Sequence, residues 1–106
     1  MIDYIQLWNM LTMEKLSSWD KIKYDFGKVN HSTIQIVEFR YNGDKEVSEI
    51  EPLCNCIGHT FKDNVLTLRW KIKQHPPRSY ESTKVIMIVY KDQSLDDLTL
   101  KAYILK

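Results

Sequence analysis

The chain has 106 residues, of which 43% are hydrophobic and 27% are charged, and it contains only three glycines and three prolines. This composition indicates one globular domain and argues against a disordered or linker-rich chain. The formal net charge of +1 provides no long-range attraction to nucleic acid or to an anionic membrane, so both partners are disfavoured.

The first segment predicts an amphipathic helix over about residues 4–16, within an N-terminal unit of residues 1–18. Asp3 and Gln6 have the spacing of a capping box. An apolar face this broad must be covered, either by the chain's own domain or by another protein chain. The pattern favours neither alternative, and we hypothesise that at least part of the Trp8 face contacts another protein chain. The four large side chains of this face, at helical spacing, are Tyr4, Leu7, Trp8 and Leu11.

From Trp19 onward the apolar residues recur with a period of two, which predicts β-strands. Turn signals occur at 42–44, 62–64 and 91–94, and Pro52 indicates a bulge or a sheet edge. The run from Val85 to Tyr90 is apolar at every position, so we expect a central strand covered on both faces. The alternating inward faces are Val37, Phe39 and Tyr41; Leu66, Leu68, Trp70 and Ile72; and Leu98, Leu100, Ala102 and Ile104.

Six or seven short strands separated by regular turns predict a mainly β protein. An antiparallel β-sandwich is the first expectation, and an up-and-down barrel is the alternative because strand order is not readable from the pattern. In either case, the face that carries Trp70 and the face that carries Phe39 should meet in one core.

Three runs of sequence carry a resemblance to a known family. They are Tyr24 to Val29 (YDFGKV), Val37 to Gly43 (VEFRYNG) and Ile50 to Cys56 (IEPLCNC), followed by a closing Ile88-Val89-Tyr90. Together they resemble the widespread bacterial Cys-X-Cys domain of unknown function related to hydin-type immunoglobulin-like domains, over about residues 19–106. The resemblance implies an immunoglobulin-like sandwich that is used for interaction and has no enzyme activity. The helix predicted over residues 4–16 lies outside it.

Cys54 and Cys56 lie two residues apart, which places both side chains on one side of a strand. With His59 they supply three zinc ligands, whereas a structural zinc site needs four, so His31 or His75 would have to complete it. Without a second cysteine pair, packing as small apolar groups is the stronger expectation. The N-terminus has no basic leader, which favours a reducing cytoplasm. We therefore expect reduced, metal-free, partly buried thiols.

No catalytic constellation is evident. His31, His59 and His75 could act as bases and the cysteines as nucleophiles, but the spacing brings none of them together. Phosphate-binding and hydrolase motifs are missing from the sequence. A basic face of Arg69, Lys71 and Lys73, with His75, Arg78 and Tyr80 beyond, has the residues of a nucleic-acid contact, although a solvated outer face is favoured.

The sequence thus predicts a non-enzymatic protein–protein interaction or structural module that works within an oligomer or larger assembly. A bacteriophage virion or decoration protein is its most concrete form, by analogy of fold. The alternative is a small regulatory protein that binds a host or cellular enzyme. We expect no cofactor, no metal and no small-molecule substrate. We also expect no membrane span, because no stretch approaches roughly 20 apolar residues. The expected location is the cytoplasm, or the host cytoplasm or virion for a viral protein.

Overall fold

Strand-forming sequence dominates the chain, and its structure is correspondingly β-rich. In this computed structural model the described residues, 18–72 and 76–106, form seven strands and no helix. The mainly β prediction is confirmed, whereas the helix predicted over residues 4–16 lies outside the described residues. The strands are β1 (Lys23–Asn30), β2 (Thr33–Arg40), β3 (Val47–Pro52), β4 (Ile57–Lys62), β5 (Val65–Ile72), β6 (Tyr80–Tyr90) and β7 (Leu95–Leu105).

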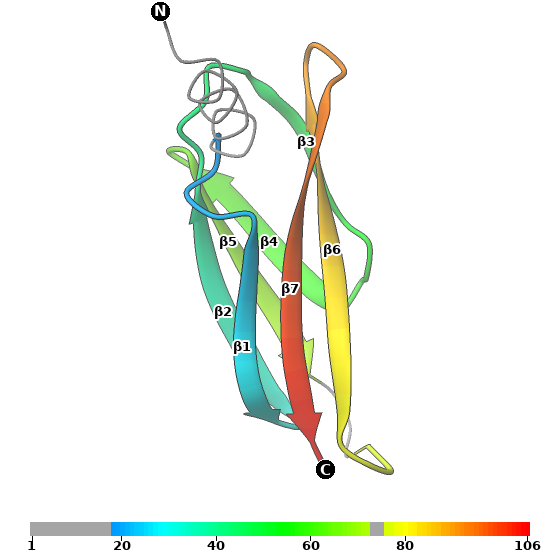
Figure 1. Cartoon of the computed structure of the whole chain (residues 1–106). Helices are drawn as coiled ribbons and strands as arrows, with labels where there is room; N and C mark the ends of the chain where they lie inside the picture. The colour runs from blue at the N-terminus through cyan, green and yellow to red at the C-terminus, as the bar shows by residue number, and fades with distance from the viewer. Residues whose placement is uncertain (1–17, 73–75) are drawn as a thin grey trace, which may run out of the picture.

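The strands form two layers (Figure 1). One sheet has the order β1-β7-β6-β3 and the other has the order β2-β5-β4. Two separate sheets make a sandwich-like fold, so the barrel alternative is wrong. All pairings are antiparallel except that of β1 with β7, which is parallel. This pair departs from the wholly antiparallel expectation because the rest of the chain connects the two strands, and no hairpin fixes their relative direction.

Apolar side chains alternate along the strands and point between the sheets. On β5, Leu68 and Trp70 are buried, while Arg69 and Lys71 face solvent. Because successive side chains on a strand point to opposite faces, one register fixes the whole inward set. The predicted common core of the Trp70 and Phe39 faces is confirmed. Its buried members are Trp19, Val29, Val37, Phe39, Tyr41, Ile57, Leu66, Leu68, Trp70, Ile72, Ile86, Ile88, Tyr90, Leu98, Leu100, Ala102 and Ile104.

Trp19 belongs to this core although it precedes the first strand. It forms an isolated antiparallel bridge with Tyr41, and β1 begins at Lys23 rather than at Trp19. The Trp19 and Tyr41 ring centroids are 5.0 Å apart, and those of Tyr41 and Tyr90 are 5.7 Å apart. Burial raises the pKa of the Tyr90 hydroxyl, and its hydrogen bond to Asp96 adds to the rise. This aromatic cluster lies where β2 and β6 end.

β6 is a central strand, as its apolar sequence predicts, and lies between β7 and β3. Its inward residues Ile86 and Ile88 are fully buried. The outward residues Val85 and Met87 are only half-buried, because no described element packs over that face of the sheet. The prediction that both faces are covered is therefore wrong. Pro52 ends the edge strand β3, which confirms its predicted position at a sheet edge.

Candidate functional site

The predicted partner-binding residues belong to the N-terminal segment. Tyr4, Leu7, Trp8 and Leu11 all lie outside the described residues, so this assignment stays a prediction. The functional geometry that the structure does show lies elsewhere, around the turn that carries the two cysteines.

Cys54 and Cys56 lie in the connection between β3 and β4, not on a strand. The chain turns back on itself at 53–56, and the Cys56 N–H donates a hydrogen bond to Cys54 Sγ at 3.2 Å. The two Cα atoms are 5.2 Å apart and the side chains form a disulfide. Such a separation suits a disulfide, whereas residues i and i+2 of an extended strand lie about 6.6 Å apart. The prediction of reduced thiols is wrong, and that of partial burial is confirmed.

The histidines are distributed over separate parts of the molecule. His31 lies in the turn between β1 and β2, with Nδ1 3.0 Å from Ser32 Oγ, while His59 is exposed on β4. His75 lies outside the described residues. Among residues 18–72 and 76–106 no three Cys, His, Asp or Glu side chains gather as a metal site would require. The described histidines therefore do not complete a site with the cysteines.

The basic face predicted on β5 is divided by the fold. Arg69 and Lys71 pair across the sheet with Ile36 and Ile34, which are 59% and 58% exposed. This outer face is thus a mixture of cations and exposed aliphatic groups. Tyr80, expected beside the cations, starts β6 in the opposite sheet. Lys73 lies outside the described residues.

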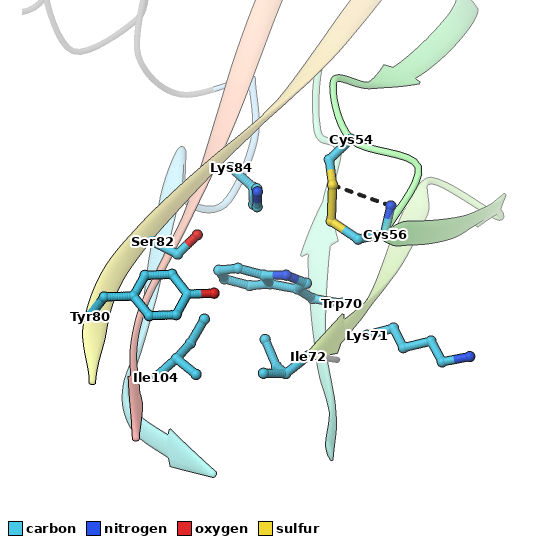
Figure 2. Close-up of a pocket in the computed structure, with 9 residues that line it drawn as sticks. All are labelled: Cys54, Cys56, Trp70, Lys71, Ile72, Tyr80, Ser82, Lys84 and Ile104. Atoms are coloured by element: carbon cyan, nitrogen blue, oxygen red, sulfur yellow. Dashed lines mark hydrogen bonds between the residues drawn. A yellow bond between two sulfur atoms is a disulfide. The ribbon is translucent and has the colours of Figure 1, made fainter. Parts of the chain in front are cut away.

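A cavity of about 200 Å³ lies between the sheets beside the disulfide (Figure 2). It exists because two strands stop early. β3 ends at Pro52, opposite Ile86 of β6, and β4 begins at Ile57, opposite Trp70 of β5. Beyond these points neither strand fills the space between β5 and β6. The lining residues are Cys54, Cys56, Trp70, Lys71, Ile72, Tyr80, Ser82, Lys84 and Ile104.

The cavity has an apolar wall and a cationic rim. Trp70, Ile72 and Ile104 are buried core residues that form the wall, and Figure 2 shows the Tyr80 ring pointing from β6 towards Trp70. Lys84 is half-buried, and no carboxylate among the described residues forms an ion pair with it. Such a site suits an apolar side chain next to a carboxylate.

No sequence motif indicates this site. Its one sequence signal is the spacing of Tyr80, Ser82 and Lys84, which continues the inward set Ile86 and Ile88 of the same strand. No family model, curated protein or solved structure matches the chain. Within the described residues, no helix has the length and apolar content that crossing a bilayer requires.

Proposed function

We propose that this chain is a non-enzymatic, immunoglobulin-like interaction module, and that its N-terminal helix contacts another protein chain within an assembly. One observation carries the proposal. The core of the described residues is made of strand residues together with Trp19 and Tyr41, all from the chain after residue 18. The two sheets thus pack their apolar faces against each other, and we assign the predicted apolar face of Tyr4, Leu7, Trp8 and Leu11 to contact with a partner.

The strand order supports the immunoglobulin-like assignment. In that fold, strands B, E and D form one sheet, while C, F and G lie together in the other. Here β2-β5-β4 and β3-β6-β7 have the same neighbours in the same chain order. β1 takes the place of strand A, paired with the last strand. A structural component of a virion is the most concrete version of this function, by analogy of fold alone.

Mass measurement tests the proposal. Multi-angle light scattering after size exclusion should give the wild-type chain a mass above its 12.6 kDa monomer. Trp8→Asp should lower that mass while far-ultraviolet circular dichroism keeps its β signal. Asn9→Asp adds the same charge on the opposite side of the predicted helix and should leave the mass unchanged. A monomeric wild type, or loss of β structure in Trp8→Asp, would contradict the proposal.

A further inference from the structure

One edge of β6 is paired along only part of its length. β7 pairs with β6 from Tyr80 to Val89, whereas β3 reaches only from Tyr90 to Ile86. Within the described residues no strand lies beside the first five residues of β6 on the β3 side. A sheet edge that is left open in this way presents unpaired backbone groups to an incoming strand.

The hydrogen bond between Leu53 and Val85 shows which way those backbone groups point. The Leu53 N–H donates to the Val85 carbonyl at 3.0 Å, so the polar groups of Val85 face the β3 edge. In an antiparallel ladder the residues i−2 and i−4 face the same edge. Glu81 and Thr83 therefore direct their N–H and C=O groups towards the open edge, where no backbone group of the described residues pairs with them.

The open edge and the cavity belong to the same stretch of β6. Tyr80, Ser82 and Lys84 alternate with the two edge-facing residues, and all three line the cavity. A strand added beside Glu81 and Thr83 would direct every second side chain into the space against Trp70 and Ile72. Main-chain hydrogen bonds would supply general affinity, and the cavity would select the side chain.

Resting on the proposed interaction function, we propose that this edge accepts an extended segment of a partner protein as an added antiparallel strand. The segment carries a carboxylate residue, then any residue, then a large apolar residue. Running antiparallel to β6, it passes Lys84 first and Ser82 next, so the carboxylate meets the Lys84 ammonium and the apolar side chain enters the cavity. A carboxylate beside Lys84 forms a charge-assisted pair, while a cation there is repelled.

Two other occupants fit less well. A second copy paired through its own β6 would bring inward only Tyr80, Ser82 and Lys84, none of which is acidic, so Lys84 would stay unpaired at the joint. The chain's own N-terminal segment joins at Trp19, which bridges Tyr41. The cavity residue Ile72 pairs with Thr33, at the other end of β2, about 25 Å from Tyr41. As the predicted helix, residues 4–16 span only about 20 Å, so this segment is the less suitable occupant.

Peptide binding to the full-length protein tests the proposal. The probe is the peptide Glu-Thr-Leu-Thr-Thr, which begins opposite Lys84 because Leu53 already occupies the position opposite Val85. The matched control replaces its Glu with Lys. Nuclear magnetic resonance should show shifts at the Glu81 and Thr83 amides with the Glu peptide. The Lys peptide should bind roughly tenfold or more weakly, as expected for loss of a charge-assisted bond. Lys84→Glu should reverse the preference between the two peptides.

A backbone variant separates strand addition from simple pocket binding. Thr83→Pro removes an N–H that faces the open edge and spares the pairing with β7, so binding should weaken roughly tenfold or more. Thr83→Val retains the N–H and should bind like wild type. Equal affinity for both peptides, shifts confined to other strands, or no shift at millimolar peptide would overturn the proposal. Because Lys84→Glu leaves the backbone intact, the test stands even if Thr83→Pro fails to fold.

The two proposals fail separately. If Trp8→Asp dissolves the assembly but neither peptide binds, the helix contact stands and the strand-accepting edge is refuted. If the Glu peptide binds as described while Trp8→Asp changes no mass, the edge stands and the helix contact is refuted.

Discussion

The Trp19 indole Nε1 donates a hydrogen bond of 2.9 Å to the Tyr90 hydroxyl, between residues 71 positions apart. The same hydroxyl donates to Asp96 Oδ2 at 2.6 Å, so one oxygen links the segment before β1, the end of β6 and the start of β7. Both rings are almost fully buried. The bond therefore ties the segment that precedes β1 to the β6–β7 hairpin.

Tyr90→Phe should lower the free energy of unfolding by about 1–3 kcal/mol, because the buried indole N–H of Trp19 loses its acceptor. Chemical denaturation followed by circular dichroism measures this change. Tyr103→Phe is the control, since Tyr103 is 41% exposed, and it should change stability by less than about 0.5 kcal/mol. Equal effects of the two substitutions would contradict this role for the hydroxyl.

Alkaline pH should act on the same residue. Burial and the bond to Asp96 raise the pKa of Tyr90 above the ordinary tyrosine value of about 10. The unfolded chain then loses this proton first, so the stabilisation is complete below about pH 10 and is lost as the pH rises towards the raised pKa. Unfolding experiments across that range should show a steeper decline for wild type than for Tyr90→Phe. Parallel curves would count against the shifted pKa.

Gly43 leaves room for a neighbouring ring. A Cβ at this position would collide with the Tyr41 hydroxyl and ring, whereas a Cβ on Gly58 would meet only Arg69 side-chain atoms at 3.9 Å or more. Gly43→Ala should therefore cost about 1–3 kcal/mol through overpacking. Gly58→Ala should be neutral or stabilise by up to about 1 kcal/mol, because glycine weakens a strand. Thermal denaturation measures the stability of both variants. A neutral Gly43→Ala would show that the Tyr41 ring can move.

The core can be tested at Trp70, which is 2% exposed and packs between the sheets. Trp70→Ala should lose about 3–5 kcal/mol of unfolding free energy, as large aromatic truncations do. Ile36→Ala removes an apolar side chain that is 59% exposed and should cost less than about 0.5 kcal/mol. Urea titrations of the two variants give the comparison, and a small effect at Trp70 would refute its central role.

The disulfide should contribute little to global stability. It closes a loop of only three residues, Cys54 to Cys56. In the chain-entropy model so short a loop is worth about 1.6 kcal/mol. The double substitution of both cysteines by alanine should therefore lower stability by about that amount and retain the β signal. Thiol titration of the denatured, unreduced wild type should find no free thiol, and finding two would contradict the bonded state.

Local patterns predicted most of the strands, because alternation is a local property. Leu66 to Ile72 identifies β5 and its inward face, and Asp63-Asn64 identifies the hairpin turn, where both residues have positive φ. The pattern predicts Trp19 as a strand residue, because its alternation with Lys21 and Lys23 continues into β1, which begins at Lys23. Its burial depends instead on the distant residue Tyr90.

The cavity and the disulfide depend on relationships between strands. Cys54 and Cys56 approach each other only because the chain turns between β3 and β4, and no turn signal marks 53–56 strongly. The open edge exists because β3 has six residues and β6 has eleven. Strand lengths can be estimated from the sequence, but the order of strands within a sheet cannot. The position of Lys84 beside a cavity was therefore not predictable.

The parallel pairing of β1 with β7 has a consequence for synthesis of the chain. Lys23 lies opposite Thr99 and Asn30 lies opposite Leu105, so among the described strands β1 pairs only with β7. During translation β1 must wait, with Val29 uncovered, until nearly the whole sandwich has emerged from the ribosome. At the usual 5–20 residues per second this wait lasts roughly 4–15 seconds for the roughly 75 residues between the paired positions. Folding that depends on so distant a contact should be slow, and a nascent chain arrested before Leu95 should remain a substrate for chaperones.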